Sequence, residues 1–228
     1  MRGYGQFCPV AKAAEVFAER WTPLVVRELL AGSAHFNDLH RGIPLMSRTL
    51  LSQRLKQLEE LGVVARKRGP RGPEYELTEA GGEFAPVIRL LGEWGQRWYR
   101  TSYRKDELDV RVLMWDLRRA VNASAFPPGR VCVQFEFRDQ SESKRRWWLV
   151  SDPAGIDLCP TDPGFEVDLF VSSDAKTLTQ VVLGDVTLRS ALARGGIELD
   201  GPRALRHSFE QWLGLSQFAA IKRARRAA

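Results

Sequence analysis

The stretch from Ser47 to Gly81 constrains the fold of this 228-residue chain more than any other part of it. Its first half is amphipathic, because leucines recur at helical spacing and form one apolar stripe. Ser47 is a favourable residue before a helix and Gly62 a favourable residue after one, so the sequence predicts a helix between them. The members of the apolar stripe are Leu50, Leu51, Leu55, Leu58 and Leu61.

A basic hairpin is predicted directly after this helix. Val63–Arg68 has the pattern of a strand with three cations, Gly69–Pro73 that of a turn, and Glu74–Leu77 that of a returning strand. A helix followed by a cationic hairpin is typical of a winged helix-turn-helix, which binds double-stranded DNA. We therefore expect a mainly α winged helix-turn-helix domain over residues 1–104.

The helix face opposite the leucines holds hydroxyl groups, an amide and cations, which are the groups that bond base edges and phosphates. Thr49, Ser52 and Gln53, with Arg48 at the edge of this face, are predicted to read the major groove. The other cations of the helix and the hairpin are predicted to hold phosphates or enter the minor groove, namely Lys56, Arg66, Lys67, Arg68 and Arg71. Arg54 lies on the flank of the apolar stripe and is expected to bond within the fold or to a phosphate. A simple solvated face is the alternative. The predicted DNA contacts are Ser47, Arg48, Thr49, Ser52, Gln53, Lys56, Arg66, Lys67, Arg68 and Arg71.

The charge distribution favours the same surface. Residues 1–104 hold 16 Lys and Arg against 11 Asp and Glu, whereas residues 105–228 hold 18 against 17. Between Ser47 and Arg71 there are seven cations and only two anions, Glu59 and Glu60. The positive field is thus expected on the predicted DNA-reading element, where phosphate neutralisation supplies affinity.

The remaining composition argues against several classes of protein. No apolar run approaches the roughly 18 residues of a transmembrane helix, and the first ten residues lack the apolar core of a signal peptide. Three widely spaced cysteines indicate neither a disulfide framework nor a zinc site. Because these cysteines need not pair, we expect a protein of the reducing cytoplasm. The three histidines are scattered and no nucleophile motif or phosphate loop is present, so we expect a protein that is not an enzyme and has no cofactor or metal.

Helices are also predicted before and after the DNA-reading element. Helices from Pro9 to about Arg20, over Leu24–Leu30 and over Phe36–His40 precede it in the order of a helix-turn-helix. A helix capped by Thr78 follows, and its apolar residues form a heptad-like seam that predicts a homodimer on a palindromic operator. Packing of the seam within its own domain is the alternative. The seam consists of Phe84, Val87, Leu91, Trp94 and Trp98.

These motifs, taken together, resemble the HxlR-type family of bacterial transcription regulators over residues of about 7–100. The resemblance rests on Cys8-Pro9-Val10, Arg20-Trp21-Thr22, Arg27-Glu28-Leu29-Leu30, Phe36-x-x-Leu39, Leu50-Leu51-Ser52-x-Arg54-Leu55-x-x-Leu58 and Tyr75-x-Leu77-Thr78-x-x-Gly81. It implies a homodimer through the first and last helices, a recognition helix at 47–61, a wing at about 64–77, and repression or activation of genes.

Cys8 has two interpretations. The resemblance implies that the matching cysteine senses oxidants or electrophiles in some members of the family. The position of Cys8 just before a helix agrees with this, because a helix N-terminus favours thiolate. A small buried hydrophobic residue is the alternative, and residues 1–104 contain no second cysteine to resolve an oxidised one.

The second half, residues 105–228, is predicted to be an α+β domain with an antiparallel sheet. The strands are expected at Val131–Arg138, Arg146–Val150, Gly155–Cys159, Glu166–Val171 and Ile197–Leu199. The helices are expected at Leu113–Val121, Asp174–Leu183, Thr187–Arg194, Pro202–Leu213 and Ser216–Arg226.

Motifs within Phe165–Leu213 carry a second resemblance, namely Val167-Asp168-Leu169, Leu178-x-x-Val181-x-x-Gly184-Asp185 and Ala191-x-x-x-Gly195-x-Ile197-x-Leu199-x-Gly201. On these motifs this half resembles the sterol-carrier-protein-like fold. The resemblance implies an apolar tunnel for lipids or other hydrophobic molecules, which would make this half the sensor of a hydrophobic effector. A solid core is the first alternative, and a lipid carrier or membrane-surface module with the basic end Lys222–Arg226 is the second. The candidate tunnel residues are Trp115, Phe135, Phe137, Trp147 and Phe170.

Overall fold

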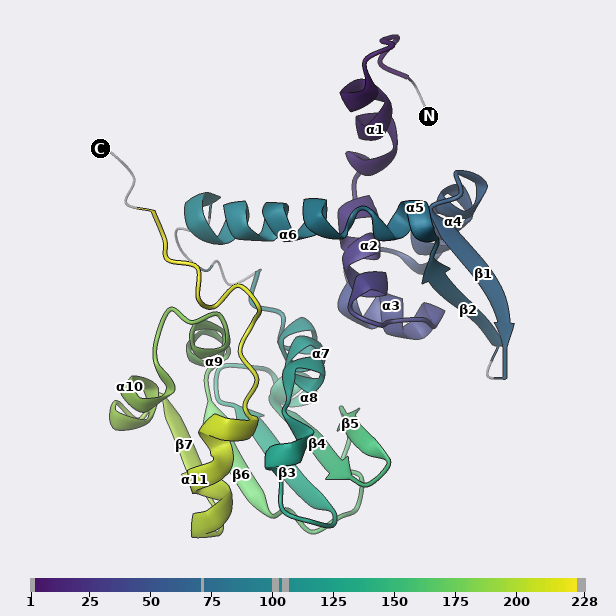
Figure 1. Ribbon diagram of the computed structural model, residues 1–228. Helices are drawn as coiled ribbons and strands as arrows, with labels where there is room; N and C mark the ends of the chain where they lie inside the picture. The colour runs from purple at the N-terminus through teal and green to yellow at the C-terminus, as the bar shows by residue number, and fades with distance from the viewer. Residues whose placement is uncertain (1–2, 71, 100–102, 104–106, 225–228) are drawn as a thin grey trace. The chain divides into compact units, whose positions relative to one another are not determined.

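The computed structural model describes residues 3–70, 72–99, 103 and 107–224 (Figure 1). The chain forms two compact units, residues 1–92 and 93–228. The first unit is mainly helical with one small sheet. Its elements are α1 (Pro9–Phe17), α2 (Thr22–Leu30), α3 (Phe36–Gly42), α4 (Arg48–Glu60), β1 (Val64–Gly69), β2 (Gly72–Leu77), α5 (Glu79–Gly82) and α6 (Ala85–Trp94).

The helices of the first unit follow the predicted order, with two differences around Trp21. The helix α1 ends at Phe17 rather than near Arg20, and Trp21 instead of Thr22 is the residue before α2. The left-handed backbone of Trp21, whose φ is 77°, explains the second difference, because such a residue cannot belong to a right-handed helix.

The two strands of the wing pair closely. Val64 lies opposite Leu77 and Gly69 opposite Gly72 in an antiparallel ladder, so the connecting turn is shorter than the predicted Gly69–Pro73. The base of β2 also pairs on its other edge, where the Tyr75 amide donates to the Ala34 carbonyl (2.8 Å). The wing is therefore attached to the segment that leads into α3.

The predicted single helix after Thr78 is wrong, because the structure divides it into three parts. The short α5 ends at Gly82, α6 runs over Ala85–Trp94, and residues Gly95–Tyr99 form a π-helix. Two adjacent glycines weaken the helix at its start, and Pro86 occupies a position in the first turn of α6 that proline favours.

The second unit is a five-stranded sheet with helices. Besides a π-helix at Gly95–Tyr99 and a 3-10 helix at Ala123–Ala125, its elements are α7 (Val110–Ala120), β3 (Val131–Phe137), α8 (Glu142–Arg145), β4 (Arg146–Asp152), β5 (Gly155–Cys159), β6 (Leu169–Ser173), α9 (Ala175–Val182), α10 (Leu188–Ala193), β7 (Ile197–Asp200) and α11 (Arg203–Trp212).

The sheet is mixed, so the predicted antiparallel sheet is wrong. Its strand order is β5-β4-β3-β6-β7, in which β3 and β6 are parallel and the other pairs antiparallel. The segment between β5 and β6 crosses the sheet before the chain returns, and parallel pairing needs such a crossover. Side-chain alternation identifies strands but carries no information about their direction.

One face of this sheet is covered by α7, α9 and α11 (Figure 1). The core between them includes Met114, Phe135, Leu178 and Trp212, which are all fully buried. The predicted last helix, Ser216–Arg226, is wrong over its described part, because residues 217–220 form a turn and 221–224 no regular structure. Residues 225 and 226 lie outside the described part of the chain.

The junction between the wing and α5 is tight enough to predict a stability effect. A Cβ added at Gly81 would lie 2.1 Å from the backbone oxygen of Val63, whereas one at Gly82 would meet nothing within 4 Å. We expect Gly81→Ala to lower the free energy of unfolding by about 1–3 kcal/mol, since a backbone atom cannot turn aside. The measurement is urea unfolding followed by circular dichroism.

Gly82→Ala is the matched control, being the same change in the same short helix. It should leave the free energy of unfolding unchanged or raise it slightly, because alanine restricts the unfolded chain. Equal effects of the two substitutions would contradict the packing argument.

Candidate nucleic-acid interface

The helix α4 is held by one apolar face. The Ser47 hydroxyl accepts a hydrogen bond from the Leu50 amide (3.3 Å) at its start, as the predicted cap requires. Leu51, Leu55 and Leu58 are fully buried, and Leu50 is half-buried. Leu61 was predicted to continue this stripe but is exposed, because α4 ends at Glu60 and Leu61 is already the capping residue.

The opposite face of α4 is open to solvent. Thr49, Ser52, Gln53 and Lys56 are all exposed, and within the described residues no hydrogen bond engages the side chains of the first three. The Lys56 ammonium lies 3.7 Å from Glu60, one turn further along the helix. The helix thus presents hydroxyl and amide groups that are free to bond a ligand.

Two arginines of α4 are engaged within the fold. Arg48 donates to the Asn37 side chain (2.7 Å) and its guanidinium lies 4.9 Å from the ring centre of Phe36. Arg54 is only 8% exposed and donates to Glu19 (3.3 Å). The prediction that Arg54 bonds within the fold is confirmed, and Arg48 joins α4 to α3 in addition to any contact with DNA.

The wing carries two exposed arginines. Strand alternation places Arg66 and Arg68 on one face of β1, and both are exposed and without an ion pair in the part of the chain that the structure describes. Lys67, on the other face, forms an ion pair with Glu76 (2.5 Å). Arg71 lies outside the described residues. A groove of about 540 Å³ runs along the wing, lined by Arg66, Lys67, Arg68, Gly69, Gly72 and Pro73.

A buried carboxylate that the sequence analysis did not single out as a site holds α2, its following turn and α3 together. Glu28 is fully buried and accepts hydrogen bonds from Arg27 (2.7 Å) and from the Ser33 hydroxyl (3.2 Å). The Arg27 guanidinium also donates to the Gly42 carbonyl (3.0 Å) at the end of α3. An acidic residue between Val25 and Leu29 on the apolar face of α2 was the available signal.

Apolar side chains are exposed on α1 and α6. Neither helix contains a fully buried residue. Of the predicted seam, Phe84 packs inward against Phe17 (4.8 Å between ring centres), whereas Val87, Leu91, Trp94 and Trp98 are exposed. Phe7 and Val10, at the start of α1, are exposed as well.

The Cys8 thiol precedes the first turn of α1. The backbone N–H groups of Ala11 and Val10 lower the pKa of Cys8 below its ordinary value of 9.0, although neither forms a well-directed hydrogen bond to the sulfur. Burial and nearby aspartates raise the pKa of Cys132 to about 11, and burial also raises that of Cys159. Among the three thiols, Cys8 is the one whose surroundings favour thiolate.

The candidate tunnel residues of the second unit do not share one face. Phe135, Phe137 and Trp147 are buried in the packed core beneath the helices. Trp115 is buried too, but the guanidinium groups of Arg118 and Arg119 lie 5.3 and 5.6 Å from its ring centre. Phe170 is 43% exposed on the other side of the sheet, because its neighbours Leu169 and Val171 are the inward residues of β6. The prediction that Phe170 lines an interior tunnel is therefore wrong.

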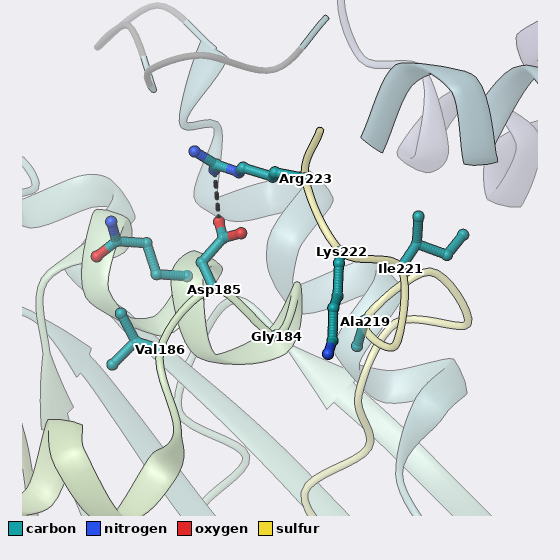
Figure 2. A pocket seen from close by; sticks show the side chains of 8 residues that line it. Gly184, Asp185, Val186, Ala219, Ile221, Lys222 and Arg223 are labelled. Atoms are coloured by element: carbon teal, nitrogen blue, oxygen red, sulfur yellow. Dashed lines mark hydrogen bonds and ion pairs between the residues drawn. The ribbon is translucent and has the colours of Figure 1, made fainter. Parts of the chain in front are cut away.

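The end of the chain forms a separate pocket of about 410 Å³ against the turn after α9 (Figure 2). The Arg223 guanidinium forms an ion pair with Asp185 (2.9 Å), and the Ala219 carbonyl lies against Gly184. Lys222 lines the pocket as well. This pocket contains none of the candidate tunnel residues.

The described residues contain neither a membrane-spanning helix nor a cluster of metal ligands. No helix in this part of the chain is both long and apolar enough to cross a membrane. No group of three or more His, Cys, Asp or Glu is placed to hold a metal ion within the same described ranges.

The fold of the first unit and the open face of α4 define a winged helix-turn-helix protein. The HxlR-like helix-turn-helix family matches residues 16–103. The chain is 37% identical over 102 residues to the uncharacterized HTH-type transcriptional regulator YvaP of Bacillus subtilis. The aligned residues cover 43% of this chain and 94% of that protein. It therefore belongs to the HxlR-like helix-turn-helix family.

One further sequence similarity covers a smaller share of the compared protein, and another similarity is structural. The chain is 42% identical over 94 residues to the uncharacterized HTH-type transcriptional regulator MT3179 of Mycobacterium tuberculosis. The aligned residues cover 39% of this chain and 58% of that protein. The reduced form of the transcriptional regulator YodB from B. subtilis aligns with 29% identity and a TM-score of 0.36, covering 40% of this chain and 93% of that one.

Proposed function

We propose that this protein is a sequence-specific DNA-binding transcription regulator. The observation that carries the proposal is the solvent-open face of α4, where the side chains of Thr49, Ser52 and Gln53 have no partner among the described residues. Beside it are Arg66 and Arg68 of β1, which form no ion pair within the same ranges. Hydroxyls and an amide on a helix suit base edges in the major groove, and free cations on a wing suit phosphates. The regulator names of the relatives support the same function.

Residues 1–104 act as the DNA-binding and dimerisation domain in this proposal. The exposed apolar side chains of α1 and α6 support a homodimer, because apolar surface exposed on a protein often marks an interaction site. Two-fold symmetry would present two copies of α4 to DNA. The operator should then be a palindrome whose half-sites lie about one helical turn apart.

Substitutions should separate reading of bases from holding of phosphates. An operator selected from a random DNA pool with the purified protein supplies the specific site, and fluorescence anisotropy supplies affinities at several salt concentrations. We expect Gln53→Ala to weaken the selected operator about tenfold or more while leaving random DNA nearly unaffected. Arg68→Ala should weaken both DNAs and reduce the slope of log affinity against log salt by about one.

Lys67→Ala is the matched control for Arg68→Ala. Lys67 is the neighbouring cation but is already paired with Glu76, so its loss should change affinity and salt slope less. Unchanged operator affinity in the Gln53→Ala, Arg68→Ala double variant would refute the assignment, and a selected site without two-fold symmetry would refute the dimer.

A thiol-based redox response through Cys8 is a second candidate. The lowered pKa of this thiol supports it, because the thiolate is the reactive form. We expect Cys8 to be alkylated by iodoacetamide at pH 7.5 faster than Cys132 and Cys159, with a pH midpoint below 9.0. Mass spectrometry of the peptides measures each rate, and Cys8→Ser should remove the fast phase.

DNA binding by Cys8→Ser completes this test. Release of DNA on oxidant treatment should be lost in the variant if Cys8 is the sensor. Oxidant-dependent release that persists in Cys8→Ser would exclude Cys8.

We also propose that residues 105–228 bind a small hydrophobic effector in a sterol-carrier-protein-like domain, with Trp115, Phe135, Phe137 and Trp147 near it. The supporting observation is the indole N–H of Trp212, which is fully buried in this core and has no acceptor among the described residues. A buried donor without a partner costs free energy, and an oxygen of a bound apolar molecule would satisfy it.

The effector proposal predicts a compound in an organic extract of the purified full chain, measured by mass spectrometry in proportion to protein. Trp212→Phe keeps a ring against Phe126 and Phe209 but removes the N–H, so it should deplete the compound several-fold. Trp148→Phe is the control, because its buried N–H also lacks an acceptor but lies on the other face of the sheet. An empty extract, or equal content in both variants, would contradict the proposal.

A further inference from the structure

The strand β7 forms one edge of the five-stranded sheet. It pairs with β6 along one side, with Val171 opposite Leu199 and Ser173 opposite Ile197. Among the described residues no strand pairs with its other side. An open edge presents backbone N–H and C=O groups that can accept a further strand.

A cleft of about 560 Å³ lies along this edge. The end of α10 contributes Leu192, β7 contributes Ile197–Leu199, and the first turns of α11 contribute Arg203, Arg206 and His207. Figure 1 shows β7 as the outermost strand, with α10 and α11 beside it. Side chains of α10 and α11 therefore line the cleft beside the edge of β7 and could contact a bound segment.

The wall from α11 is cationic and uncompensated. Arg203 and Arg206 are exposed, and neither has an ion-pair partner within the described ranges. The Nδ1 atom of His207 lies 3.0 Å from the Arg203 carbonyl of its own helix. Glu198 is the one carboxylate that lines the cleft, and it is already paired with Arg138 (2.6 Å).

The two faces of β7 differ in charge. Ile197 and Leu199 point toward the core, on the side of α11, whereas Glu198 and Asp200 lie beside Ser172 and Phe170 on the other face. An added strand would place alternate side chains on these two faces. Those on the side of α11 would meet Arg203 and Arg206, and those on the other side would meet carboxylates.

We propose that the edge of β7 and the cationic wall of α11 bind an extended acidic segment of a partner protein by strand addition. Acidic residues at every second position face Arg203 and Arg206, and the residues between them are uncharged or basic because they face Asp200 and the Glu198–Arg138 ion pair. Backbone hydrogen bonds supply affinity and the alternation supplies specificity. The partner is distinct from DNA and from the apolar effector.

The test uses the full-length protein and a labelled octapeptide of alternating threonine and glutamate, blocked at both ends, followed by fluorescence anisotropy. Its control has the same composition, with four threonines followed by four glutamates. We expect saturable binding of the alternating peptide that is at least tenfold tighter than that of the control. Equal affinity of the two peptides would overturn the proposal.

Charge reversal locates the site. The double variant Arg203→Glu, Arg206→Glu should bind the alternating peptide at least tenfold more weakly than the parent protein does. It should instead bind the peptide in which lysine replaces glutamate. Arg66→Glu with Arg68→Glu makes the same change in net charge on the wing, so it should weaken DNA but leave peptide affinity within twofold. Peptide binding that follows the wing variant instead would overturn the assignment to β7.

Backbone pairing is tested by N-methylation of the peptide. Alternate N–H groups of a strand point to the same side, so methylating all threonine amides and methylating all glutamate amides remove opposite sets. One of the two methylated peptides should lose binding at least tenfold more than the other. Equal losses would show attraction between charges alone and would overturn strand addition.

Discussion

The buried carboxylate of Glu28 is the constraint on which the geometry of the candidate DNA interface depends. Its hydrogen bonds to Arg27 and Ser33, and the bond from Arg27 to the Gly42 carbonyl, fix where α3 ends relative to α2. The chain has only five residues between Gly42 and α4. A shift at the end of α3 would therefore move the start of α4, and with it the open polar face.

The wing is fixed to the other end of α4 by backbone groups. The Val63 amide donates to the Leu58 carbonyl (2.9 Å), and the Val63 carbonyl accepts from the Thr78 amide (3.1 Å). Gly81 packs directly against that carbonyl. One residue thus joins the last turn of α4 to the returning end of the hairpin, so that the cations of β1 keep a constant position relative to the face of α4.

The sequence predicted the parts of the first unit whose signal is local. Ser47, Thr78 and the leucines of α4 each act within a turn or two of themselves, and their roles could be read from spacing. The contacts of Arg48 could not be predicted from local spacing, because its partners Asn37 and Phe36 are contributed by α3. The divided helix after Thr78 shows two conflicting local signals, because Gly81, Gly82 and Pro86 favour a break whereas the apolar seam favours one continuous helix.

The second unit shows what alternation alone leaves open. A strand with apolar residues on both faces, such as β4, is buried on both, and Phe170 was assigned to the interior because it is aromatic. The structure places it beside Gln134 and Asp200 instead. Pairing order decides which residues share a face, and pairing between β3 and β6 depends on a crossover that no local pattern encodes.

Pairing order also creates the charged edge. Asp200 and Arg203 are three residues apart in the sequence, where opposite charges suggest a simple surface pair, but the turn at Gly201 separates them. Gly201 has a φ of 151° and lies against the Asp168 carbonyl, where a Cβ would approach to 2.6 Å. This close approach sends Asp200 to one face of the sheet and α11 to the other. Asp200 is thus kept from neutralising Arg203 and Arg206, while Glu198 on its face is paired with Arg138, so the cationic side of the β7 edge keeps its charge.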